Sequence, residues 1–168
     1  MGDILYLECN KNEEHKYEFF VGSGMMFSSE YNKLINQIKK GKYGEEIRKF
    51  LIENPKGAIN CEREIVQCPK CGKLKEVPNL SMYIAKKNND NIVASFDIPF
   101  ELKTKYKKFK DYKHVCSKCS STMKIVKIKH DDCGCVLEDK NGAVITNIKI
   151  KCPKCDGTIK ISRGGCWD

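Results

Sequence analysis

The chain has 168 residues, of which 40% are apolar, and its 31 basic and 22 acidic residues give a formal net charge of +9. The apolar content can build a modest core, which excludes a wholly disordered chain, and the length limits the protein to one or two small domains. No uncharged stretch approaches the roughly 18 apolar residues of a membrane span, and the charged N-terminal segment has no signal-peptide core. We therefore expect a cytoplasmic protein, in which the 11 cysteines favour metal binding over disulfides.

The N-terminal region predicts a β-hairpin followed by two helices. Apolar segments at residues 4–8 and 16–21 flank a polar tip at residues 10–15, as in a hairpin. Ser28 and Ser29 can cap a first helix, which Gly41 ends, and a second helix covers residues 44–54 before Pro55. The apolar residues at helical spacing are Tyr31, Leu34, Ile35, Ile38, Ile47, Phe50 and Leu51. We expect the two helices to form an αα-hairpin that packs on the hairpin strands.

A lysine-rich helix is predicted to begin near Pro99, after a polar loop at residues 86–91. Leu102, Tyr106, Phe109 and Lys113 fall on one helical face, so the aromatic side chains are expected to face the core. After His114 the apolar pattern changes to a period of two, which predicts strands at residues 123–129 and 144–150.

Positive charge is concentrated in residues 103–129, which contain ten lysines and one acidic residue, while the rest of the chain is neutral. Such a segment is the electrostatic signature of a nucleic-acid contact, and its interleaved aromatic residues can stack on bases. The candidate nucleic-acid-binding residues are Lys103, Lys105, Lys107, Lys108, Lys110 and Lys113. Few of the cations are arginines, the better phosphate ligands, so a merely solvated lysine face stays open as an alternative.

Three Cys-x-x-Cys pairs indicate zinc knuckles: Cys68/Cys71, Cys116/Cys119 and Cys152/Cys155. In a knuckle a tight turn holds two thiolates on one side of the metal, and a glycine after the second cysteine suits the positive φ of that turn. Because zinc takes four ligands, each knuckle needs a partner. We expect Cys116/Cys119 to join Cys152/Cys155 in a C-terminal zinc ribbon, since a strand follows the first pair and another precedes the second.

The ligands that complete the Cys68/Cys71 site are not determined by the spacing. The candidates are Cys9 with His15 in the N-terminal hairpin, Cys61, or Cys133 with Cys135. A different closure also stays open, in which Cys68/Cys71 joins Cys116/Cys119 and Cys133/Cys135 joins Cys152/Cys155.

Several short motifs resemble those of a family of small, uncharacterised bacterial zinc-ribbon proteins of the Cys-Pro-x-Cys-Gly type. They are Gly24-Met25-Met26-Phe27, Lys40-Gly41-Lys42-Tyr43-Gly44-Glu45, Cys68-Pro-Lys-Cys-Gly72, His114-x-Cys116-x-x-Cys119, Cys152-Pro-Lys-Cys155 and Trp167-Asp168. The resemblance covers nearly the whole chain and implies architecture, since no activity is established for that family. It implies that a knuckle in the N-terminal hairpin completes the Cys68/Cys71 site. Cys9 has no second cysteine nearby, so His15 stands in as the ligand.

Motifs of enzymes are absent from the sequence. It has no His-Glu-x-x-His, no zinc-deaminase pattern, no dinucleotide fingerprint and no phosphate-binding Gly-Lys-Ser/Thr loop. We therefore expect no catalytic activity, no small-molecule substrate and no membrane partner.

The sequence thus predicts an α+β, zinc-stabilised protein with an N-terminal β-hairpin and αα-hairpin followed by a C-terminal zinc ribbon. Residues 1–98 form the first region, with one knuckle, and residues 99–168 form the lysine-rich helix and the ribbon. We expect a non-catalytic protein with two Zn²⁺ ions that binds nucleic acid through residues 103–129 and the ribbon. A protein-protein interaction module, or a redox- or metal-responsive protein that uses Cys61, Cys133, Cys135 and Cys166, stays open as an alternative.

Overall fold

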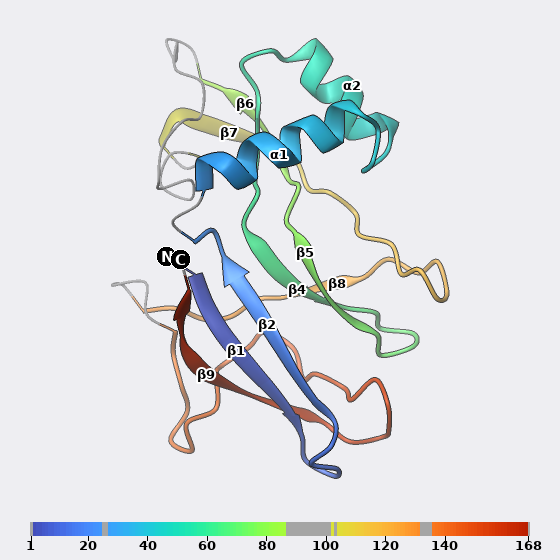
Figure 1. The fold of residues 1–168 in the computed structure, drawn as a ribbon, viewed down its shortest axis with the longest axis vertical. Helices are drawn as coiled ribbons and strands as arrows, with labels where there is room; N and C mark the ends of the chain where they lie inside the picture. Colours follow the sequence, from blue (N-terminus) through green and yellow to red (C-terminus); the bar gives the residue numbers. More distant parts are fainter. Residues whose placement is uncertain (1, 25–26, 87–101, 103, 132–135, 168) are drawn as a thin grey trace. The chain divides into compact units, whose positions relative to one another are not determined.

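The computed structural model describes residues 2–24, 27–86, 102, 104–131 and 136–167. Two helices and nine strands are named in chain order (Figure 1): β1 (Gly2–Cys9), β2 (Lys16–Gly22), α1 (Phe27–Lys39), α2 (Glu45–Glu53), β3 (Ala58–Ile59), β4 (Arg63–Gln67), β5 (Leu74–Pro78), β6 (Met82–Ala85), β7 (Tyr106–Lys110), β8 (Lys124–Val126) and β9 (Ile159–Trp167). They belong to two compact units. Unit 1 comprises Met1–Gly22, Arg63–Val77 and Lys113–Asp168, and unit 2 comprises Ser23–Glu62 and Pro78–Tyr112.

Unit 1 is built on one antiparallel sheet with the strand order β5-β4-β2-β1-β9, in which β8 also pairs with β4. Figure 1 shows β1 between β2 and β9, and β9 accompanies β1 over its whole length, from Gly2↔Trp167 to Cys9↔Ile159. Leu5 and Leu7 of β1 are fully buried, whereas Tyr6 between them is exposed, as expected for a strand with one face on the core. The chain ends are therefore held together by a long strand ladder.

Unit 2 packs α1 and α2 together with the three-stranded sheet β3-β6-β7. Its main core contains seven buried side chains from both helices, the sheet and the segment before β6: Leu34, Ile38, Ile47, Phe50, Ile59, Leu80 and Met82. The helical residues of this core recur every three or four positions, which is why the amphipathic pattern is visible in the sequence.

The predicted N-terminal hairpin and both predicted helices are confirmed, but the expected packing of the helices on the hairpin strands is wrong, because the helices share their core with the sheet β3-β6-β7 of unit 2 and the hairpin belongs to unit 1. The hairpin strands β1 and β2 pair with Glu8 opposite Lys16 at the tip. Helix α1 ends just before Gly41, which has a φ of 82°, and α2 is followed by Asn54 and Pro55. The α+β class is confirmed as well, with helices and two antiparallel sheets.

The predicted lysine-rich helix is wrong over Tyr106–Lys110, which form strand β7 on the edge of β6. A register shift makes Lys110 pair with Met82 and Lys108 with Tyr83, so Phe109 has no partner position in the ladder. This bulge breaks the alternation by which a strand is recognised, and the spacing of Leu102, Tyr106 and Phe109 then imitates a helix. The predicted helix start at Pro99 lies outside the described residues.

The predicted C-terminal ribbon is wrong as well. Residues 127–129 and 145–147 are antiparallel, but they meet only around the single bridge Ile128↔Thr146. The strand that follows Cys119, β8, pairs instead with Ile65–Gln67 of β4. Because of this pairing, Cys116 and Cys119 lie beside the tip of the β4–β5 hairpin and do not share a cluster with Cys152.

Each unit is assembled from separate chain segments. The expected division between residues 98 and 99 lies outside the described residues. Among the described helices, none has the length and the apolar character needed to cross a membrane.

We expect Ile38→Ala to lower the free energy of unfolding of unit 2 by about 2–5 kcal/mol, because Ile38 is 0% exposed and its truncation leaves a cavity. Ile52→Ala is the matched control, since Ile52 in α2 is 66% exposed and its loss should change stability by about 0.5 kcal/mol or less. Denaturant unfolding followed by the circular dichroism of the helices measures both. Equal effects of the two substitutions would contradict this core.

Candidate metal centres

Four cysteines of unit 1 form the first candidate metal centre, the all-cysteine site. Cys68 and Cys71 lie at the tip of the β4–β5 hairpin, and Cys116 and Cys119 lie in a second tip that the bridge Val115↔Thr122 closes. The sulfur of Cys68 lies 3.4 Å from that of Cys119, and the sulfur of Cys71 lies 3.5 Å from that of Cys116. All four sulfurs lie within 4.8 Å of one another.

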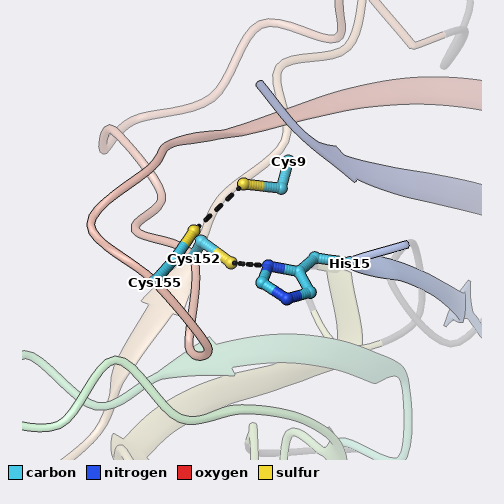
Figure 2. Close-up of side chains that lie close together, drawn as sticks. All are labelled: Cys9, His15, Cys152 and Cys155. Atoms are coloured by element: carbon cyan, nitrogen blue, oxygen red, sulfur yellow. Dashed lines mark hydrogen bonds between the residues drawn. The ribbon is translucent and has the colours of Figure 1, made fainter. Parts of the chain in front are cut away.

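Three cysteines and a histidine form the second centre, the cysteine–histidine site (Figure 2). Cys9 ends β1 and His15 directly precedes β2, so both belong to the N-terminal hairpin, while Cys152 and Cys155 come from a tip closed by the bridge Lys151↔Thr158. The sulfur of Cys9 lies 3.4 Å from that of Cys155, and the sulfur of Cys152 lies 3.4 Å from Nδ1 of His15. Figure 2 shows the three sulfurs and the imidazole converging on one point.

The geometry of both clusters fits a tetrahedral metal ion. Zinc–sulfur bonds of about 2.3 Å place the corners of a tetrahedron about 3.8 Å apart. In each cluster the ligand atoms approach one another to 3.4 Å, and none of the pairs exceeds 4.8 Å. Thiolate and imidazole ligands in sets of four are the donor sets that zinc prefers in structural sites. The clusters are therefore two metal sites of cysteine and histidine ligands, consistent with two Zn²⁺ ions.

Backbone hydrogen bonds shape the three Cys-x-x-Cys tips in the same way. The N–H of the first cysteine donates to the carbonyl five residues later: Cys68 to Lys73, Cys116 to Ser121 and Cys152 to Gly157. Inside these turns and at Cys9, backbone N–H groups approach the sulfurs, such as that of Lys118 at 3.4 Å from Cys116 and that of Gly157 at 3.4 Å from Cys155. These donors stabilise thiolates, the form in which cysteine binds a metal.

Hydrogen bonds shift three of the ligand thiols towards the thiolate, and the backbone N–H of Lys118 is the main cause that lowers the pKa of Cys116. The backbone N–H of Lys11 is the main cause that lowers the pKa of Cys9 to about 6. The hydroxyl of Ser121 is the main cause that lowers the pKa of Cys119 to about 6. Each site therefore contains at least one cysteine that loses its proton readily, which favours metal binding at neutral pH.

Glycines close to the two sites have different physical roles. Gly72 has a φ of 72°, the left-handed conformation expected after the second cysteine, and Ser120 takes the equivalent position with a φ of 56°. Gly157 is needed for space, because a Cβ there would lie 2.7 Å from the sulfur of Cys9 and 3.3 Å from that of Cys155. The expected positive φ thus holds at Gly72, while the requirement at Gly157 is a close approach that the sequence does not reveal.

All eight residues predicted as ligands lie in these two clusters, but they are grouped differently from the prediction. The pairing of Cys116/Cys119 with Cys152/Cys155 is wrong, because each of these pairs lies in a different cluster. The completion of the Cys68/Cys71 site by the N-terminal hairpin is wrong too, since Cys9 and His15 join Cys152/Cys155. Of the alternative closure, the pairing of Cys68/Cys71 with Cys116/Cys119 is observed, whereas the pairing of Cys133/Cys135 with Cys152/Cys155 is wrong, because Cys9 and His15 complete that set of four.

The two other cysteines that the structure describes, Cys61 and Cys166, belong to neither cluster. Burial is the main cause that raises the pKa of Cys61 to about 12, so this thiol of unit 2 is poorly suited to fast redox chemistry. Cys166 is exposed on β9, with the guanidinium of Arg163 at 2.9 Å from its sulfur. Cys133 and Cys135 lie outside the described residues.

The structure places most of the predicted nucleic-acid-binding lysines on or beside β7. Lys107, Lys108 and Lys110 are exposed on the strand, Lys113 is exposed just after it, and Lys105 is half-buried just before it. Lys103 lies outside the described residues. Lys108 forms an ion pair with Asp111, and Lys110 forms one with Glu46.

No protein-family model matches this sequence, and no curated protein or solved structure shows significant similarity to it. The zinc-ribbon resemblance of the short motifs therefore stays a prediction, and the metal sites rest on the geometry of the chain itself.

We expect Gly157→Ala to abolish metal binding at the cysteine–histidine site and to leave the all-cysteine site filled, because the new Cβ would clash with the sulfur of Cys9 at 2.7 Å and crowd that of Cys155 at 3.3 Å. The variant should carry one zinc per chain in place of two, as measured by elemental analysis after gel filtration. Gly142→Ala is the control: its φ of 67° adds a backbone strain that Gly157→Ala does not have, but nothing lies within 4 Å of the new Cβ. Two zinc ions per chain in Gly157→Ala would contradict the assignment.

We also expect removal of the metals to unfold unit 1, because a structural zinc contributes on the order of 10 kcal/mol or more to folding. Trp167 is the only tryptophan, and it is held in unit 1 by a hydrogen bond of 2.9 Å to the carbonyl of Val21 and by an edge contact with Phe20. Chelation should shift its fluorescence to longer wavelength, and added zinc should restore it. An unchanged emission spectrum of the verified metal-free protein would show that the sites do not maintain the fold.

Proposed function

We propose that this protein is a non-catalytic zinc-binding protein that binds nucleic acid through strand β7. The observation that carries this proposal is an open groove of about 450 Å³ over β6 and β7, lined by Ile84, Ala85, Lys86, Lys107, Lys108 and Phe109. Its floor is apolar and its lysines supply positive charge beside an aromatic ring. Stacking surfaces flanked by cations are the usual means of binding single-stranded nucleic acid without sequence preference.

The exposure of Phe109 supports a stacking role. Its ring is 57% exposed, although it also stacks on Phe50 with the ring centroids 5.4 Å apart. The register shift in the β6–β7 ladder leaves this residue outside the regular pairing. Phe109 is thus supported from below by a core residue and open on its outer side, as a base-stacking platform requires.

The ion pairs on β7 are compatible with phosphate binding. Lys108–Asp111 and Lys110–Glu46 are pairs between exposed side chains, and such pairs contribute only about 0–1 kcal/mol. A phosphate can therefore replace the carboxylate at small cost. The net charge of the protein also stays positive with both metals bound. Four thiolates with one Zn²⁺ contribute −2 and three thiolates with one Zn²⁺ contribute −1, so the formal charge falls from +9 to about +6.

The ligand sets support a non-catalytic role for zinc. Each site offers four protein ligands, so a tetrahedral ion would have no open position for water or substrate. Zinc here would maintain the fold of unit 1 and leave the contact with a partner to surface side chains.

A protein-binding module is the second candidate, favoured by the apolar floor of the same groove. Ile84 is 37% exposed beside Phe109, and two such side chains also suit an apolar peptide. The two candidates differ in their salt dependence, because only the polyanion releases condensed counterions on binding.

We expect the zinc-loaded protein to bind single-stranded oligonucleotides with a log-log salt slope of about −3 to −4, corresponding to about five phosphate contacts. Binding measured by fluorescence anisotropy between about 50 and 200 mM salt gives this slope. Lys107→Ala with Lys108→Ala should reduce its magnitude by about 1.4, and Phe109→Ala should weaken binding about 5- to 150-fold at an unchanged slope.

Lys40→Ala with Lys49→Ala is the matched control, since these exposed lysines belong to the same unit and their loss changes the net charge equally. This variant should bind as the wild type does. Absence of binding at the lowest salt would overturn the nucleic-acid proposal and make the protein-binding module the first choice.

A further inference from the structure

A glutamine links the two metal sites of unit 1. Gln67 directly precedes Cys68, and Lys151 directly precedes Cys152, so both residues stand immediately before the first cysteine of a Cys-Pro-Lys-Cys tip. Gln67 is only 5% exposed, which is unusual for a glutamine unless its amide is fully hydrogen-bonded.

The side-chain amide of Gln67 makes three hydrogen bonds that connect the tips. Its Nε2 donates to the carbonyl of Lys151 at 2.7 Å and to the carbonyl of Gly72 at 3.1 Å. Its Oε1 accepts the backbone N–H of Lys151 at 3.1 Å. One amide thus satisfies both backbone groups of the residue before Cys152 and at the same time holds the turn after Cys71.

The two tips also approach each other directly. A Cβ on Gly72 would lie 3.5 Å from the Cα of Pro153 and 3.6 Å from the carbonyl oxygen of Cys152. Both tips line one open groove of about 470 Å³, to which each contributes ligand cysteines. The turns that present the ligands of the two sites are therefore neighbours with few atoms between them.

We propose that Gln67 is a positioning residue for both metal sites, and that through it a metal ion bound at one site raises the affinity of the other. A metal at the all-cysteine site fixes the turn from Cys68 to Gly72, and with it the orientation of the Gln67 amide. The amide then presents its donor and acceptor to Lys151 in the geometry that the Cys152 turn needs. Leaving either the Gln67 amide or the backbone groups of Lys151 buried without a hydrogen-bond partner costs free energy, so the two turns become ordered together.

Coupling between two binding sites is reciprocal, so the cysteine–histidine site must strengthen the all-cysteine site by the same factor. Coupling free energies of this kind correspond to about 5- to 150-fold in affinity. The inference rests on the two metal sites and not on the β7 groove, so it can fail while the nucleic-acid proposal stands.

The test is native mass spectrometry of the full chain with one equivalent of zinc. Independent sites of equal affinity would leave about half of the chains with one metal, and unequal independent sites would leave more. With positive coupling, chains with no metal and with two metals should dominate the wild-type spectrum. Gln67→Met keeps the size of the side chain and removes its hydrogen bonds, so its one-metal population should rise well above that of the wild type.

Two further variants separate positioning from general destabilisation. Gln67→Glu can still accept the N–H of Lys151 but cannot donate to the carbonyls, and it should also lose coupling; it serves as the test if Gln67→Met does not fold. Gln37→Met is the control, since Gln37 is a hydrogen-bonded glutamine of unit 2 that accepts from Tyr43 and Lys42. It should show the wild-type distribution.

Each variant is first titrated with excess zinc, and a folded unit 1 is expected to bind two zinc ions. An equal one-metal population in the wild type and in the folded Gln67 variants would overturn the proposal. The proposal would also be overturned if the one-metal species dominated the wild-type spectrum at one equivalent of zinc and its population were the same in Gln67→Met.

Discussion

Tetrahedral coordination by side chains from distant segments is the constraint on which unit 1 depends. This unit is assembled from three separate parts of the chain, and between β8 and β9 the described residues pair through isolated bridges such as Ile128↔Thr146 and Glu138↔Val144. Ordering the loops between these bridges costs conformational entropy. Two metal ions, each joining two tips, would offset part of that cost and add to the stabilisation from the sheet and its apolar core.

The two sites share one construction although their ligands differ. In each, a β-hairpin carries two ligands at its tip, a second tip supplies a Cys-x-x-Cys pair, and the strand after that pair returns along the first strand of the hairpin. The hairpins are β1–β2 and β4–β5, and the returning strands are β9 and β8. The wider β1–β2 tip separates Cys9 from His15 by six positions, so an imidazole, longer than a thiol side chain, reaches the position that a cysteine occupies in the narrower tips.

Local signals in the sequence were sufficient for the ligands but not for their pairing. Each Cys-x-x-Cys turn is specified by residues within the turn, and the hairpin around Cys9 and His15 follows from its flanking strands. Which tips meet depends on whether β8 pairs with β4 or with residues 144–150, and short strands with a period of two are compatible with both partners. The predicted helix in the lysine-rich segment is wrong for a related reason: a bulge at Phe109 changes the period of β7, and this bulge arises only from the pairing with β6. Gln67 carried no signal, because its role arises between segments distant in sequence.

The ligands of the all-cysteine site lie, along the chain, between those of the cysteine–histidine site. Metal binding at one site can therefore favour binding at the other through loop-closure entropy alone. Cys68 and Cys119 are 51 residues apart, and they lie within the interval of 146 residues that separates Cys9 from Cys155. When a metal closes the inner loop at the all-cysteine site, the outer loop that the cysteine–histidine site must close becomes shorter. Each doubling of loop length costs about 0.6 kcal/mol, so the closure free energy of the outer loop falls by about 0.4 kcal/mol, or about twofold in metal affinity. Chain topology alone therefore couples the sites only weakly. Any stronger coupling has to pass through atoms in contact, and in the described part of unit 1 the Gln67 amide joins the two turns that present the ligands.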